Sequence, residues 1–196
     1  NMKNKILIWE IGSFFFIGLV GAALHFTYEF SNYSSNVVAY FSAVNESTWE
    51  HLKMVFFPGL LFALVQYTYV REEANNYIVA KTSTLLIMPL VIVVGWYIYA
   101  PIVGRSVYPV DLFLFYLAVL IGQVISYKLL TRPPLEKKYT QFAIGTFVVL
   151  FVAFSVFTFF PPKIFLFEHL DLKNTGKYGI LPLEDNIRYF TKPPQQ

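Results

Sequence analysis

The stretch Ile78–Val103, IVAKTSTLLIMPLVIVVGWYIYAPIV, decides the fold class, because it carries a single charged side chain, Lys81. A run of about 20 predominantly apolar residues is long enough for a helix to cross a bilayer. We therefore predict a membrane-spanning helix over this stretch. Its two prolines, Pro89 and Pro101, are expected to lie at kinks, because neighbouring helices can satisfy the backbone groups that proline leaves unpaired.

Four further stretches have the same apolar character, and we predict spans at residues 6–30, 52–70, 110–130 and 140–160. The 196-residue chain is 56% hydrophobic and only 14% charged. A soluble domain of this size could not bury so much apolar surface. The sequence thus predicts an all-α integral membrane bundle of five transmembrane helices in residues 1–160. Residues 161–196 are expected to form a membrane-surface tail with a short ordered cap.

Composition also excludes several classes of function. The chain has no cysteine, which rules out disulfides, thiolate catalysis and cysteine-based metal sites. Its net charge is only +3, and the basic residues lie between the apolar runs. That placement is typical of membrane-flanking charges, so we expect the lipid bilayer as a partner and no nucleic acid.

The basic side chains also predict an orientation in the cell membrane. One set of connections receives most of them: Lys3, Lys5, Arg71, Lys81, Lys128, Arg132, Lys137 and Lys138. The opposite set receives only Lys53 and Arg105. Because cytoplasmic loops carry the excess of lysine and arginine, we predict a cytoplasmic N-terminus and, after five spans, an extracytoplasmic tail. His25, His51 and His169 would then all fall on the outer half.

The densest polar stretch is Asn45-Glu46-Ser47-Thr48-Trp49-Glu50-His51. His25 and Glu29 lie four residues apart in the first span, hence on one helix face. Together with the heptapeptide they could form an outward-facing pocket for a small or lipid-like ligand.

Imidazole and carboxylate groups suit zinc and similar divalent metals, so we predict His25, Glu29, Glu50 and His51 as metal ligands. Without a metal, His25, Glu50 and His51 could act as catalytic acid and base in an apolar cavity. Asn45, Glu46, Glu29 and Trp49 are expected to contact the ligand. Metal-assisted hydrolysis or acid–base isomerisation fits these residue types best.

A simpler interpretation of the heptapeptide stays open. Ser47-x-x-Glu50 matches the capping box, in which each side chain accepts from a backbone amide at the start of a helix. Trp49 suits the aromatic belt at a membrane interface. On this interpretation the protein is a non-catalytic membrane partner or a transporter subunit, and its polar cluster only caps helices.

Two features of the first span concern helix packing. Gly18 and the sequence Gly21-Ala22-Ala23 give it a face of small residues, which favours close contact with another helix. Glu10 lies well inside the apolar run. It is either a buried proton-carrying acid or the partner of a lysine, with Lys81 among the candidates.

The heptapeptide and the following Leu52-Lys53, with Phe56-Phe57-Pro58, resemble the signature of an uncharacterised family of small bacterial multi-pass membrane proteins. Phe160-Pro161-Pro162 and Gly176-Lys177-Tyr178-Gly179 resemble that family's tail. This resemblance implies a membrane topology and no assigned activity. Membrane hydrolases with three-histidine zinc sites are a weaker comparison, because this chain lacks their His-x-x-x-His pair.

Overall fold

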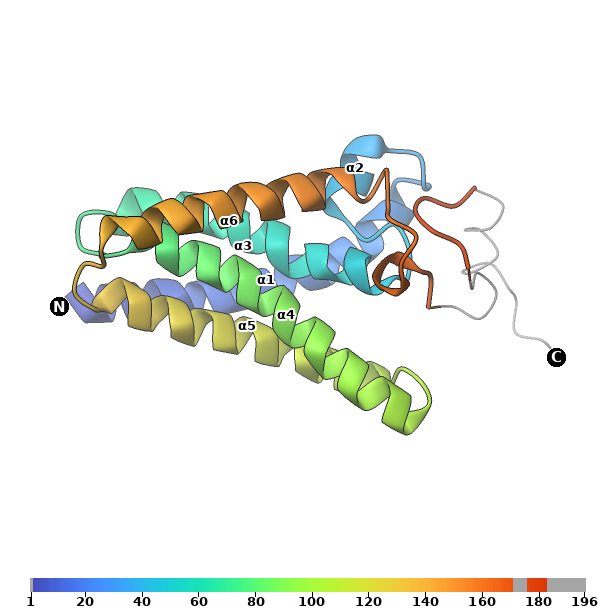
Figure 1. Ribbon diagram of the computed structural model, residues 1–196, viewed down its shortest axis with the longest axis horizontal. Helices are drawn as coiled ribbons and strands as arrows, with labels where there is room; N and C mark the ends of the chain where they lie inside the picture. The colour runs from blue at the N-terminus through green and yellow to red at the C-terminus, as the bar shows by residue number, and fades with distance from the viewer. Residues whose placement is uncertain (1, 171–175, 183–196) are drawn as a thin grey trace.

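The computed structural model describes residues 2–170 and 176–182 of the chain. Five long helices form an elongated bundle (Figure 1): α1 (Met2–Phe30), α3 (Thr48–Val70), α4 (Tyr77–Val103), α5 (Tyr108–Thr131) and α6 (Lys137–Val156). A short helix α2 (Asn36–Phe41) and a 3-10 turn η1 (Phe165–Phe167) complete the secondary structure. Within the described residues there are no strands, only two isolated β-bridges. The predicted all-α fold is confirmed.

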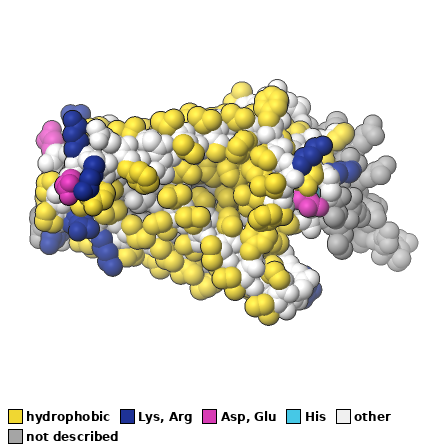
Figure 2. Space-filling model, viewed as in Figure 1, with side chains coloured by type: hydrophobic (Ala, Val, Ile, Leu, Met, Phe, Trp, Pro, Cys, Tyr) yellow, Lys and Arg dark blue, Asp and Glu magenta, His cyan; other side chains and the backbone are white. Residues whose placement is uncertain are grey.

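The five long helices are all long and apolar enough to cross a membrane. Large apolar side chains cover the middle of the bundle, while charged side chains gather towards its ends (Figure 2). Many large apolar side chains are exposed, among them Leu19, Phe142 and Val149 at 70%, 77% and 68%. A surface that faces water rarely contains so many of them. This is the surface expected of a multi-pass membrane protein.

The helix bounds differ from the predicted spans by up to four residues, most at the start of α1, the start of α3 and the end of α6. α3 begins at Thr48, earlier than the predicted Leu52, because the Ser47 side chain caps it by accepting from the Glu50 amide at 3.3 Å. α6 ends at Val156, and the turn that follows brings Thr158 into the interior. Pro89 and Pro101 lie inside α4, as expected, and Pro58 lies inside α3.

Helices α1 and α3 pack closely at a glycine. A Cβ atom added to Gly21 would lie 2.4 Å from the backbone oxygen of Met54 and 2.8 Å from the Phe115 ring. Only a glycine lets the two backbones approach this far, which is the packing role predicted for the small face of α1.

A second contact among the helices is polar and lies near the N-terminal end of the bundle. Glu10 forms a buried ion pair with Lys81 at 2.7 Å, and Gln66 donates to the same carboxylate oxygen at 2.7 Å. Lys81 also donates to the Ser126 hydroxyl at 2.9 Å. This network ties α1, α3, α4 and α5 together, and it settles the partner of Glu10 as Lys81.

The opposite end of the bundle is closed by α2 and the tail. Helix α2 was not predicted from the sequence. The Ser35 side chain caps it by accepting from the Val38 amide at 3.3 Å. Phe167 of η1 packs against Trp49 with ring centroids 4.7 Å apart. Residues 171–175 and 183–196, which the predicted cap includes, lie outside the described residues.

Candidate functional site

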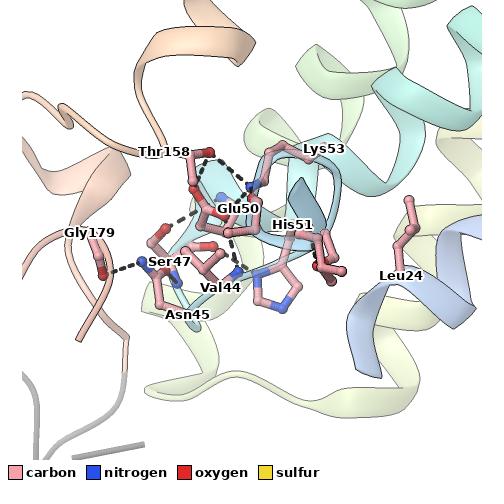
Figure 3. A network of polar contacts seen from close by, with 12 residues as sticks. Leu24, Val44, Asn45, Ser47, Glu50, His51, Lys53, Thr158 and Gly179 are labelled. Atoms are coloured by element: carbon pink, nitrogen blue, oxygen red, sulfur yellow. Dashed lines mark hydrogen bonds and ion pairs between the residues drawn. The ribbon is translucent and has the colours of Figure 1, made fainter. Parts of the chain in front are cut away.

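The heptapeptide forms the connection from α2 to α3 and the first turn of α3. Asn45 has two roles there: its side-chain oxygen accepts from the Ser47 amide at 2.7 Å, and its side-chain nitrogen donates to the Gly179 carbonyl at 3.0 Å (Figure 3). Asn45 therefore fixes both the start of α3 and the tail above it. The expected capping box is only half formed, since Asn45 occupies the place of Glu50 at the Ser47 amide.

Glu50 instead belongs to a buried charge network that joins α3 to the turn after α6 (Figure 3). Its carboxylate pairs with Lys53 at 2.6 Å, accepts from the Thr158 hydroxyl at 3.1 Å and accepts from the Val44 amide at 3.1 Å. Lys53 also donates to the Ala39 carbonyl at 2.8 Å. Glu50 and Lys53 are 2% and 0% exposed, so every charge in this network is paired inside the protein.

The structure brings a different set of groups together: His25 from α1, Glu46 from the connection and His51 from α3. One ligand-type atom from each lies within 4.8 Å of the other two. The rings of His25 and His51 are 5.4 Å apart between centroids, and the His51 Nε2 atom lies 3.5 Å from the Glu46 carboxylate. Among the described residues, this is the one group of three such side chains that could hold a metal ion.

The orientation of His51 is fixed by the backbone. Its Nδ1 atom lies 2.8 Å from the Ser47 carbonyl, which can only accept, so Nδ1 carries the hydrogen. The Nε2 atom is then directed at a carboxylate oxygen of Glu46. Two electron-rich atoms face one another there, and a proton or a metal ion between them would satisfy both.

Glu46 is the member of this group outside the spanning helices. Burial would raise the pKa of its carboxyl, but the hydrogen bond from His51 and the charges of His51, His25 and His169 outweigh it and lower the pKa to about 2. Glu46 is therefore a carboxylate at neutral pH.

A large cavity opens beside the group of three. Its volume is about 500 Å³, and it lies between α1, α3, α4 and α5, with Leu170 of the tail at its edge. His25, Glu46 and His51 line one part of it. Most of the remaining wall is apolar: Ala22, Phe26, Met54, Ile92, Trp96, Leu112, Leu114 and Phe115.

A second polar group lines the same cavity from α5 and the connection before it. The Asp111 carboxylate accepts hydrogen bonds from the hydroxyls of Tyr99 and Ser106. Asp111 and Ser106 are in the wall of the cavity together with Tyr108. The cavity thus has polar groups contributed from two sides and an apolar interior between them.

The other predicted site residues lie elsewhere. Glu29 and Asn45 line a smaller cavity of about 40 Å³, which also borders His25, Glu46 and His169. Trp49 stacks on Phe154 at 4.5 Å in the aromatic core and lines neither cavity. Glu50 likewise lines neither of them. Of the residues predicted for the site, the structure thus brings His25 and His51 together, with Glu46 as the carboxylate beside them, and Glu29 and Glu50 are not in that group.

Sequence reasoning missed the roles of Lys53 and Thr158. Lys53 was interpreted as a flanking charge, yet it is fully buried. A signal for it existed: Glu50 and Lys53 are three residues apart, the spacing at which opposite charges pair on a helix. No local signal points to Thr158, which is distant in the sequence.

Chemically, the group of His25, Glu46 and His51 can do two things. It can hold a divalent metal, since two imidazoles and one carboxylate are a common ligand set for zinc. It can also hold a proton between His51 and Glu46 and act as an acid–base pair. Both uses benefit from the apolar cavity, where interactions between charges are less screened than in water.

The fold and the surface define a helical protein with five potential membrane spans and a polar site at one end of the bundle. The chain belongs to a family of unknown function, DUF6512, whose model matches residues 1–180. This confirms the predicted resemblance to an uncharacterised family. No curated protein and no solved structure matches the chain.

Proposed function

We propose that this is a multi-pass membrane protein that binds an amphipathic, lipid-like ligand in the cavity between α1, α3, α4 and α5. The observation that carries the proposal is the composition of the cavity wall: His25, Glu46 and His51 converge at one side of an otherwise mostly apolar space. Ligand pockets typically occupy about 300–1,000 Å³ and combine apolar walls with a few convergent polar groups. The ligand's headgroup would lie at the histidines and its chain along Met54 and Ile92.

The position of the cavity supports a ligand that arrives from the bilayer. At this end of the bundle the hairpin of α4 and α5 leans away from the other helices (Figure 1). Its apolar side chains are strongly exposed there, with Ile98 at 61%, Ile102 at 81% and Phe113 at 63%. A lipid in the surrounding membrane could therefore reach the space between the helices without crossing water.

The alternative, in which the polar cluster only caps helices, accounts for part of the heptapeptide. Ser47 and Asn45 fix the start of α3, and Glu50 serves the charge network with Lys53. It does not account for His25, Glu46 and His51, which cap no helix by their side chains and border the cavity. We therefore favour a ligand at these three residues.

Filling the cavity should displace the ligand. Ile92→Trp replaces an aliphatic side chain in the wall with a bulkier indole ring. We expect the amount of lipid retained by the purified protein to fall about tenfold, equivalent to ~1.4 kcal/mol of binding free energy. Val149→Trp on the exposed face of α6 is the matched control and should retain the wild-type amount. Retained lipid is extracted after extensive detergent washing and quantified by mass spectrometry. Equal retention in both variants would contradict the proposal.

We also propose that the N-terminus is cytoplasmic and the site extracytoplasmic. At the end of the bundle that holds the site, Lys53 is buried in its ion pair, the connection from α4 to α5 exposes Arg105, and the tail after α6 exposes Lys163. The opposite end exposes Lys128, Arg132, Lys137 and Lys138, a bias typical of the cytoplasmic side.

The absence of cysteine makes this orientation directly testable. In intact cells a membrane-impermeant maleimide should label Arg105→Cys and Lys163→Cys, but label Glu72→Cys only after permeabilisation. All three positions are exposed and lie outside the helices. The reverse pattern would overturn the orientation. Labelling of Arg105→Cys and Lys163→Cys from different sides would show that α6 does not cross the membrane together with α5.

A further inference from the structure

We propose that His25, Glu46 and His51 form a binding site for a divalent metal ion of the zinc type, with an open coordination position that faces the large cavity. This inference deepens the proposed function and rests on it only for the identity of the group at the open position. The metal would anchor a polar or anionic headgroup of the lipid-like ligand.

The spacing of the three side chains fits such an ion. Bonds of about 2.0–2.2 Å at tetrahedral angles hold two ligand atoms of zinc about 3.3–3.5 Å apart. The His51 Nε2 atom and the Glu46 carboxylate oxygen are 3.5 Å apart. The ligand atom of His25 lies within 4.8 Å of both, so a small side-chain rotation completes the set.

The surroundings of the two histidines support metal binding independently of that spacing. An imidazole that binds a metal normally donates its other N–H to a carbonyl or carboxylate, which orients the ring. His51 makes this contact with the Ser47 carbonyl at 2.8 Å. The Nδ1 atom of His25 is buried and has no hydrogen-bond partner among the described residues, so it needs a cation or a water molecule.

The number of ligands implies an open position. Catalytic and ligand-binding zinc sites typically use three protein ligands and leave the fourth position to water or substrate, whereas structural sites use four. Here the three side chains line the cavity that the ligand would occupy, and Glu50, which was also predicted as a ligand, is already held by Lys53 and Thr158. A headgroup oxygen or a water molecule would complete the coordination.

The test uses the full-length protein in detergent, stripped with a chelator and titrated with Co²⁺, whose visible absorption reports tetrahedral coordination. We expect one Co²⁺ per chain, displaced by Zn²⁺. Loss of a group that only orients a ligand commonly costs 10–100-fold in affinity, so His25→Gln, Glu46→Gln and His51→Gln should each cost at least about 100-fold.

The matched control is Glu29→Gln. Glu29 lies four residues from His25 on the same helix, and of the two cavities it borders only the small one. The variant's affinity for Co²⁺ should equal that of the wild type. Glu46→Asp keeps the carboxylate and should retain tetrahedral Co²⁺ binding. It therefore distinguishes loss of the ligand group from misfolding caused by a change at this position. Thermal unfolding of each variant shows that the bundle is intact.

Three outcomes would overturn the metal site. Wild-type protein that binds no Co²⁺ leaves only an ion pair between His51 and Glu46. Unchanged binding by Glu46→Gln removes the proposed carboxylate ligand, and loss of binding by Glu29→Gln assigns that role to Glu29. The ligand proposal is tested separately, because Ile92→Trp should lose the lipid but still bind Co²⁺. Wild-type protein that binds Co²⁺ but retains no lipid would therefore contradict the proposed function alone.

Discussion

Lys53→Met should lower the free energy of unfolding by about 3–5 kcal/mol, because it leaves the Glu50 carboxylate buried without its partner. The ion pair is 2.6 Å long and is shielded from solvent on both sides. Thr158 and the Val44 amide also bond to the carboxylate, but neither supplies a compensating positive charge. The loss is measured from thermal or denaturant-induced unfolding of the purified protein in detergent.

The matched control for this variant is Lys138→Met. Lys138 pairs with Glu136 at 2.9 Å, but both side chains are more than 60% exposed, and exposed pairs contribute about 0–1 kcal/mol. The double variant Glu50→Leu with Lys53→Met removes both charges and should recover much of the stability, since an apolar pair of similar volume can replace a buried ion pair. A single variant as stable as Lys138→Met would show that the buried ion pair contributes little to stability.

Measuring both the stability and the Co²⁺ affinity of these variants separates a structural role of Glu50 from a role in the site. If Glu50 serves only the charge network, Lys53→Met and Glu50→Gln should alter stability far more than they alter Co²⁺ affinity. A specific loss of metal binding in a stable Glu50→Gln variant would return Glu50 to the site, as the sequence originally suggested.

The five spans could be predicted from the sequence because the length and apolar character of a run are local properties. The cap at Ser47 was predictable for the same reason, since it depends on the side chain of Ser47 and the nearby amide of Glu50. The gathering of His25 and His51 at one end also followed from the number of spans. These parts of the fold required no knowledge of how the helices pack.

The partners of Glu50 and His51 could not be predicted, because the spans are apolar on all sides. A soluble helix shows which face is buried by the periodicity of its apolar residues. α3 gives no such signal, so its rotation is set by packing against α1, α2, α4 and the tail. That rotation directs Glu50 to Lys53 and Thr158 and directs His51 to the cavity.

Glu46 escaped assignment as a metal ligand for a different reason. It lies in the connection before α3, where no helical periodicity fixes the direction of a side chain. Asn45 and Ser47 on either side hold the backbone through the contact at 2.7 Å, and Asn45 also bonds to Gly179 of the tail. The carboxylate therefore reaches His51 through contacts with a segment more than 100 residues away, which no local pattern contains.

Gly21→Ala should destabilise the protein by about 3 kcal/mol, at the upper end of the usual cost of overpacking. The added methyl group would lie 2.4 Å from the backbone oxygen of Met54, and a backbone atom cannot rotate away as a flexible side chain can. The helices α1 and α3 must therefore separate. Gly145→Ala in α6 is the control, because nothing lies within 4 Å of its added methyl group.

The same substitution should weaken the site as well as the fold. His25 follows Gly21 by four residues on one face of α1, and His51 precedes Met54 by three residues on α3, so both histidines are about one turn from the point of contact. Forcing the helices apart there moves the two imidazoles apart, and we expect Gly21→Ala to lower Co²⁺ affinity about tenfold or more. Gly145→Ala should leave Co²⁺ binding unchanged and should not lower the stability, because alanine favours a helix more than glycine does. If Gly21→Ala unfolds at a lower temperature but binds Co²⁺ as tightly as the wild type, the spacing of α1 and α3 does not set the geometry of the site.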